Sequence, residues 1–431
     1  MCRIARTDHA RAPISRASFS AEGKIGHGRA RRARRLQRGL RMKSISRAAL
    51  GLLLSVAAFG CETTPYGVNA RSASRARVGV TSLTAASVIT ETGLQDRMRE
   101  MFLDRAAWTR LYAVALWSKS PDANVTRARL MRTDAEIGGV FARFYGRAAG
   151  DRLTRMLDDG LDWQAAAVRG AMAGDHARVA EARHGWFIDS SRLATWLATL
   201  NPAFSQAGLS IALRTIAAEA VNQANGAGDA EAMVGQNLAL ADIFAGGIAE
   251  QFPRKVAGPA LDPRAQSVRV VLRDAFAVRG MLLHEYVVAP SVGARERVAA
   301  SGSAVVRPLG FFYGAALATE LGEIMQRDAR DATATIDAAL SGDESALDAA
   351  RNAWGVDADR FAILLSRANS RFDRNTIDRA LRDAIAAAVT DARRRRDANW
   401  VTGADAADVL RGRMARVGDV ISGPTISQFA L

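Results

Sequence analysis

Residues 144–204 read FYGRAAGDRLTRMLDDGLDWQAAAVRGAMAGDHARVAEARHGWFIDSSRLATWLATLNPAF, and residues 312–372 read FYGAALATELGEIMQRDARDATATIDAALSGDESALDAARNAWGVDADRFAILLSRANSRF. The two stretches lie 168 positions apart and are identical at 18 of 61 positions without a gap. Composition alone would give about five identities in such Ala-rich sequence. Self-similarity of this length predicts one structural unit that is present twice along the chain.

The repeat extends beyond this stretch on both sides. Upstream the offset becomes 174, because the first copy has six more residues in the loop after residue 117. Downstream the offset becomes about 177. We therefore expect one copy over residues 92–252 and a second over 266–429, with residues 253–265 as the linker between them. The aligned pairs in these flanks include Arg105 with Arg279, Tyr112 with Tyr286, and Phe252 with Phe429.

The apolar periodicity within each copy is helical. From Leu94 to Leu116 apolar residues recur at steps of three and four, which marks one face of a long helix. Alanine dominates and alternating β-branched runs are scarce. The sequence predicts an all-α fold of two tandem helical-bundle domains, with about six helices each and a core like that of a four-helix bundle. Helix N-caps are expected at Asp122, Asp175, Asp343 and Asp373.

The segment 42–61, MKSISRAALGLLLSVAAFGC, has the order of a secretory signal: two basic residues, an uncharged apolar run and small residues. Its ending resembles the lipobox of bacterial lipoproteins. The resemblance implies acylation of Cys61, which then becomes the mature N-terminus in the membrane. An ordinary signal peptide, an uncleaved anchor and a cytosolic protein are the alternatives. Residues 62–91 are polar and small, and they are predicted to form a flexible tether.

The basic charge is concentrated at the beginning of the chain. The net charge of +15 comes mostly from residues 1–47, which carry 14 Lys and Arg against two acidic residues. From residue 79 onward 42 basic residues face 41 acidic ones. We interpret residues 1–41 as a disordered basic leader or a misplaced start and expect no nucleic acid as a partner. A nucleic-acid binder would need residues 1–41 in the mature protein.

The polar and aromatic residues shared by both copies are the candidate ligand-binding positions. Packing is the simpler role for the aromatic pairs, and Asn201 and Asn369 are expected to end or cap helices. Arg105 and Arg279 lie near the apolar stripe, where we expect them to extend toward solvent; turned inward, they would bind an anion. The candidates are Arg105, Arg279, Tyr112, Tyr286, Tyr145, Tyr313, Trp186, Trp354, Asn201 and Asn369.

Motifs for cofactors, metals and nucleophilic catalysis are missing from the sequence. The Glu-x-x-His of Glu181 and His184 would need a second such motif, but the second copy has Ala349 and Asn352 at those positions. Neither a Gly-x-Gly-x-x-Gly, a P-loop nor a Gly-x-Ser-x-Gly pattern occurs. We therefore expect no metal, no cofactor and no catalytic residue that can be named.

Trp108-Thr109-Arg110, Phe144-Tyr145-Gly146, Trp186 and Asn201-Pro202 together resemble a group of poorly characterised secreted bacterial helical-bundle proteins. The resemblance implies a fold and no activity. The function expected from the sequence is that of a lipid-anchored protein of the bacterial cell envelope. It would face the periplasm from the outer membrane rather than the inner one, and its bundles would bind an envelope protein or a small ligand, or act structurally. The alternative is an envelope enzyme that uses polar residues inside the bundles.

Overall fold

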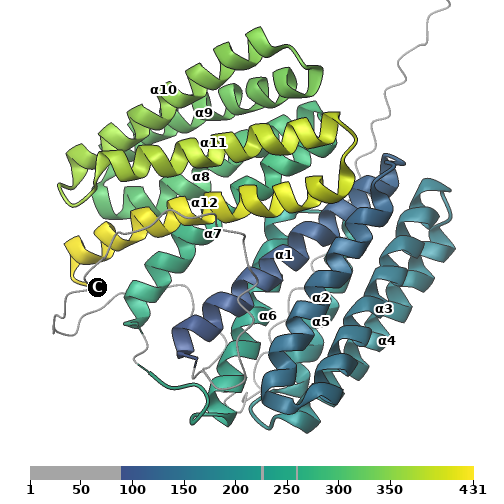
Figure 1. Ribbon diagram of the computed structural model, residues 1–431. Coiled ribbons are helices and arrows are strands. Elements are labelled where there is room, and N and C mark those ends of the chain that lie inside the picture. Colours follow the sequence, from purple (N-terminus) through teal and green to yellow (C-terminus); the bar gives the residue numbers. More distant parts are fainter. Residues whose placement is uncertain (1–88, 225–227, 259–260) are drawn as a thin grey trace, which may run out of the picture. The chain divides into compact units, whose positions relative to one another are not determined.

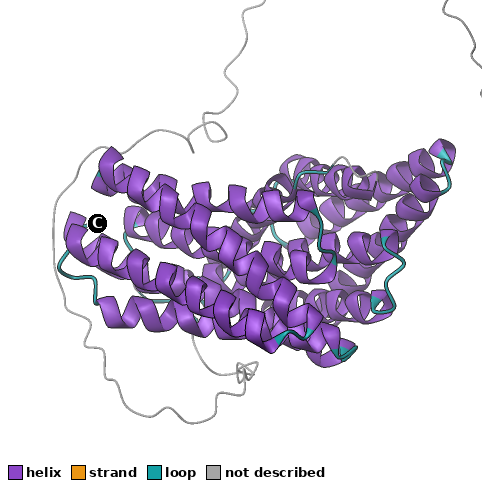
Figure 2. Cartoon of the chain, turned by 90° about the horizontal axis from the view of Figure 1, so that it is seen from above, coloured by secondary structure: helices purple, strands orange, loops and turns teal. Residues whose placement is uncertain are grey.

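The computed structural model describes residues 89–224, 228–258 and 261–431. These residues form helices joined by short loops (Figures 1 and 2) and contain no strand, although an isolated bridge pairs Ile89 with Val256. The predicted leader, signal, Cys61 and nearly all of the tether lie outside the described residues. The helices are α1 (Glu91–Trp117), α2 (Ala123–Tyr145), α3 (Arg147–Met172), α4 (His176–Leu200), α5 (Gln206–Ala224), α6 (Ala230–Gln251), α7 (Pro263–Val288), α8 (Val292–Tyr313), α9 (Ala315–Ser341), α10 (Glu344–Ala368), α11 (Arg374–Arg396) and α12 (Trp400–Phe429).

The predicted apolar face of α1 is the centre of the first six helices. Leu94, Met98 and Phe102 are fully buried, as the three- and four-residue spacing requires. Phe102 meets Phe244 of α6 edge to face, with ring centroids 5.4 Å apart. The all-α prediction is therefore confirmed for the described residues, and the core is an interior packed between helices.

Helix starts follow the predicted caps with one exception. The carboxylates of Asp175, Asp343 and Asp373 each accept a backbone N–H from the first turn of the helix that follows. The Asp122 side chain makes no such bond to α2. It accepts instead from the Ser120 hydroxyl and pairs with Arg395, so a tertiary contact has replaced the cap.

The first six and the last six helices pack in the same order. In each set the first helix lies against the last, α1 against α6 and α7 against α12, and successive helices are neighbours. The sets also touch each other, through α1 with α7 and α2 with α12. All described residues fall within one compact unit. We refer to α1–α6 as the first half and α7–α12 as the second half.

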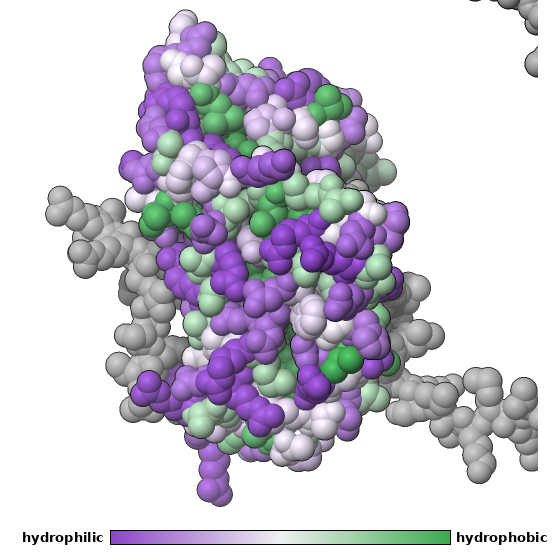
Figure 3. All heavy atoms as spheres, turned by 90° about the vertical axis from the view of Figure 1, so that its right-hand side faces the viewer, coloured by the Kyte–Doolittle hydropathy of each residue, from purple (hydrophilic) through white to green (hydrophobic). Residues whose placement is uncertain are grey.

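One described helix, α6, is long and apolar enough to span a membrane by length and composition. It is a core helix, because Met233, Phe244 and Ile248 are buried against the rest of the first half. On the face seen in Figure 3, apolar side chains form small areas scattered among hydrophilic ones. Such scattered exposure is normal for a protein surface.

Candidate functional site

Asn201 ties three elements of the first half together. It follows α4 and is fully buried. Its Nδ2 donates to the Tyr145 hydroxyl at 2.9 Å and to the Gly247 carbonyl at 2.8 Å, while its Oδ1 accepts from the backbone N–H of Ala203 at 2.9 Å. Burial raises the pKa of Tyr145 to about 12, so its phenol stays neutral. The amide thus fastens the turn before α5 to the end of α2 and to α6.

Asn369 makes the equivalent bonds in the second half. Its Nδ2 donates to the Tyr313 hydroxyl and to the Pro424 carbonyl, both at 3.2 Å. Its Oδ1 accepts from the backbone N–H of Arg371 at 2.9 Å. Phe429 packs on Tyr313 with ring centroids 5.5 Å apart, as Phe252 packs on Tyr145 at 5.2 Å. Both amides have their donors and acceptor engaged within the protein.

Arg105 and Arg279 do not extend toward solvent, so that expectation was wrong. They are 6% and 1% exposed, because each guanidinium has an internal carboxylate partner. The Nε of Arg105 donates to Asp134 at 2.8 Å, and Asp134 is itself fully buried. Arg279 pairs with Asp328 and donates at 2.8 Å to the Ser301 hydroxyl.

The carboxylate partners of these arginines occupy different helices in the two halves. Asp134 lies on α2, and Gly302 stands at the aligned position of the second half. Asp328 lies on α9, and its aligned position in the first half is Gly160. A search for residues shared by both copies finds the arginines but misses the aspartates, because the aspartates are not shared.

The two tryptophans are core residues with different polar contacts. Trp354 Nε1 donates to Asp328 at 2.6 Å. Trp186 packs on Gly160, where an added Cβ would lie 2.9 Å from Nε1. The glycine therefore makes room for an indole in the first half, while the aspartate accepts the indole N–H in the second.

The remaining candidates, Tyr112 and Tyr286, are also buried. Burial raises the pKa of both phenols. The Tyr286 hydroxyl donates to Asp337 at 2.8 Å and accepts from Arg295 at 2.7 Å. The structure does not bring the ten candidates together; they lie in separate clusters within the two halves.

A charged network that sequence reasoning missed joins the halves. Asp104 and Arg129 of the first half interlock with Asp408 and Arg411 of α12. Arg411 Nη2 lies 2.6 Å from Asp104 and 2.7 Å from Asp408, and Arg129 Nε lies 2.6 Å from Asp408. Trp108 Nε1 also donates to Asp408 at 3.1 Å. Arg129 aligns with Arg297 of the second copy, but Asp104 has Val278 at its aligned position, so the shared spacing did not reveal the network.

Electrostatics inside this network are uneven. Burial raises the pKa of Asp104 to about 6, although Arg411 opposes the shift. The pKa of Asp408 is lowered, because Arg411 and Arg129 together outweigh the cost of its burial. A second contact between the halves is bidentate, with Arg110 Nε and Nη2 donating to Glu285 at 2.6 and 2.9 Å.

A small cavity beside this network is lined by the residues best suited to catalysis. The cavity has a volume of about 20 Å³, so it holds little more than one water. His284 Nδ1 lies 2.6 Å from Asp391 in its wall, and both residues are buried. The Trp108 ring lies 5.7 Å from the imidazole, and Arg395 stacks on Trp400 at 4.7 Å.

Within the described residues no group of three or more His, Cys, Asp or Glu side chains is placed to hold a metal ion. No family model, curated protein or solved structure matches the chain. The case for function therefore depends on the contacts described above.

Proposed function

We propose that the protein is a lipid-anchored helical scaffold of the bacterial cell envelope, with a structural or partner-binding role and no catalysis of its own. The observation that carries the scaffold role is the pair of Asn–Tyr clusters. The side-chain amides of Asn201 and Asn369 form hydrogen bonds that join helices. The shared arginines form ion pairs with internal carboxylates. The signal-like segment 42–61 supports the anchor.

We also propose that the two halves arose by tandem duplication. The aligned asparagines, tyrosines and phenylalanines make equivalent contacts in the two halves. Each half has six helices in the same packing order. Because the network of Asp104, Arg129, Asp408 and Arg411 buries charges between the halves, we expect them to act as one rigid body rather than as two independent domains.

The second candidate is an envelope enzyme, and the His284–Asp391 pair favours it. A carboxylate on Nδ1 fixes the tautomer of an imidazole and leaves Nε2 for proton transfer, which is the arrangement of a general base. The cavity beside the imidazole has room for the single water that such a base would activate. This candidate predicts that His284→Gln abolishes function while the melting temperature stays unchanged.

A complementation experiment separates the two. A strain that lacks the protein is scored for an envelope defect, such as detergent sensitivity, and is then supplied with the wild type, Cys61→Ser or His284→Gln. The scaffold proposal predicts that His284→Gln restores resistance and that Cys61→Ser does not. A folded His284→Gln protein that fails to restore resistance would favour the enzyme.

A further inference from the structure

An indole in the first half completes the hydrogen bonds of a half-buried carboxylate, Asp189, whose side chain is 26% exposed. Trp163 Nε1 on α3 donates to Asp189 Oδ2 on α4 at 2.8 Å, while Asp189 Oδ1 pairs with Arg192 at 3.0 Å. Gly185 makes room for the ring, because an added Cβ there would lie 2.5 Å from Trp163. Each oxygen of this carboxylate therefore has a donor.

The second half keeps the carboxylate and loses the donor. Under the 168-residue offset Asp189 becomes Asp357, Trp163 becomes Asp331 and Gly185 becomes Ala353. Asp357 is 1% exposed, and its Oδ1 lies 3.3 Å from Arg327 and 3.2 Å from Arg360. Its Oδ2 is buried and accepts from no N–H or hydroxyl group.

A buried acceptor without a donor costs about 1–3 kcal/mol. In the second half a second acid, Asp331, also stands where the first half has the Trp163 indole. Burial, the charge of Asp357 and a hydrogen bond between the two carboxyl groups raise the pKa of Asp331. A group that brings both N–H donors and positive charge would relieve both penalties.

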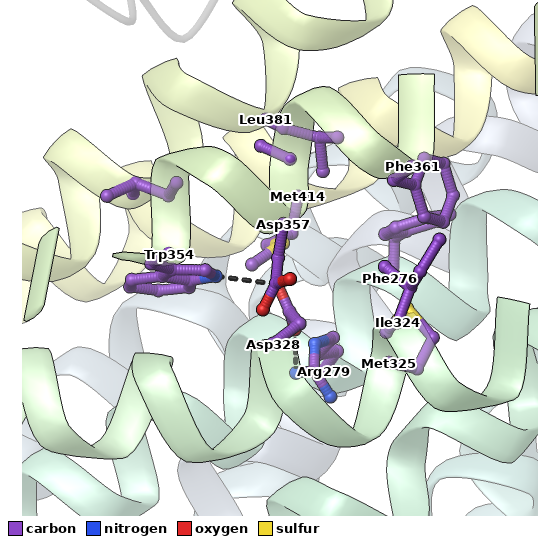
Figure 4. A pocket seen from close by; sticks show the side chains of 12 residues that line it. Phe276, Arg279, Ile324, Met325, Asp328, Trp354, Asp357, Phe361, Leu381 and Met414 are labelled. Atoms are coloured by element: carbon purple, nitrogen blue, oxygen red, sulfur yellow. Dashed lines mark hydrogen bonds and ion pairs between the residues drawn. The ribbon is translucent and has the colours of Figure 1, made fainter. Parts of the chain in front are cut away.

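Asp357 also forms part of the wall of a cavity inside the second half. Figure 4 shows Asp328, Asp357 and Trp354 pointing toward one another with apolar side chains around them. The cavity has a volume of about 10 Å³, which suits a single small head group. Met325 and Met414 line its wall, and unbranched methionine side chains can repack around an apolar tail.

We propose that the second half binds a small primary alkylammonium compound at Asp357. Its ammonium head donates to Asp357 Oδ2 beside Asp331, in the place of the indole N–H of the first half. Its alkyl part packs against Trp354 and the two methionines. A primary ammonium group carries three N–H donors on a compact charge, which matches two adjacent carboxylates. The proposal is independent of the scaffold role.

Isothermal titration calorimetry of the full chain with n-butylammonium chloride tests the site. We expect saturable binding with one site per chain. Tetramethylammonium chloride carries the charge without an N–H donor, and n-butanol carries a donor without the charge, so both should bind at least about ten-fold more weakly. Absence of saturable n-butylammonium binding, or equal binding of tetramethylammonium, would overturn the proposal.

Matched variants assign the binding to the second half. Asp357→Asn should weaken n-butylammonium binding about ten-fold or more, whereas Asp189→Asn at the aligned position should leave it unchanged. Asp331→Trp combined with Ala353→Gly rebuilds the indole of the first half and should abolish binding. Thermal denaturation checks that each variant is folded, and Asp331→Asn, with one carboxylate removed, provides the same test if the double variant does not fold. Binding that is unaffected by Asp357→Asn would contradict the assignment.

Discussion

Asn201 and Asn369 each join three elements of their half through a single side-chain amide. Asn201 and Asn369 were expected to end or cap helices, and each does accept a backbone N–H in the turn that follows. Their longer reach, to a tyrosine hydroxyl and to a carbonyl of the sixth helix of the half, could not be predicted. Those partners lie 46 to 56 residues away, and no local pattern records them.

Replacing either asparagine by alanine should therefore destabilise the protein. Each change leaves a carbonyl and a half-buried phenol without the amide donor, at a cost of about 1–3 kcal/mol. Urea denaturation of Asn201→Ala and Asn369→Ala measures this, with Asn124→Ala, at an exposed position, as the control. Effects as small as that of the control would mean that these bonds do not hold the turns.

The buried ion pair of the first half makes a sharper prediction. Arg105→Met leaves the fully buried Asp134 without its counter-charge, which costs about 3–5 kcal/mol. Adding Asp134→Asn removes the stranded charge and should recover part of the loss. A double-mutant cycle of unfolding free energies measures the coupling, and additive effects would argue against a direct pair.

At the scale of elements, helix positions followed from periodicity, whereas the crossings between helices did not. The apolar stripe of α1 and three of the four predicted caps are confirmed, because both depend on neighbours within a few residues. Where α2 crosses α3, Gly150 lies against the backbone of Gly138. Whether a helix glycine serves such a crossing depends on a partner helix that sequence spacing does not reveal.

Substitution by alanine should change the stability in opposite directions at a glycine of this crossing and at an exposed glycine of α2. At Gly150 an added Cβ would lie 2.4 Å from the Gly138 carbonyl oxygen, so Gly150→Ala should destabilise the protein by about 1–3 kcal/mol. Gly139 is exposed and has nothing within 4 Å of an added Cβ. Gly139→Ala should stabilise α2 by about 0.5–1 kcal/mol. If both variants shift the melting temperature in the same direction, the close approach of α2 and α3 at Gly150 would be contradicted.

At the scale of the whole molecule, the repeat predicted two similar sets of helices but nothing about their contact. The residues that join the halves are charged. Arg99 and Arg129 align with Arg273 and Arg297 of the second copy, but the alignment does not say which carboxylates they meet across the contact. The net charge of the body, close to neutral from residue 79 onward, conceals a buried set of arginines and aspartates. Such pairs become visible only when α1 and α2 are placed against α7 and α12.

The contact between the halves should carry a specific pH dependence. Folding raises the pKa of Asp104 from 3.8 to about 6, so this group contributes stability below about pH 4 that is lost as the pH rises through about 6. Asp104→Asn removes that contribution. Relative to the variant, the wild type should therefore lose stability between pH 4 and 6, as measured by urea denaturation across this range. A difference between the two proteins that does not change with pH would contradict the assignment.

The central claim of an anchored envelope scaffold is tested most directly by the intact mass of the protein purified from membranes of its native host. The account predicts a chain that begins at an acylated Cys61, without residues 1–60. A soluble chain that retains residues 1–41 would contradict the envelope assignment and return nucleic acid to consideration as a partner.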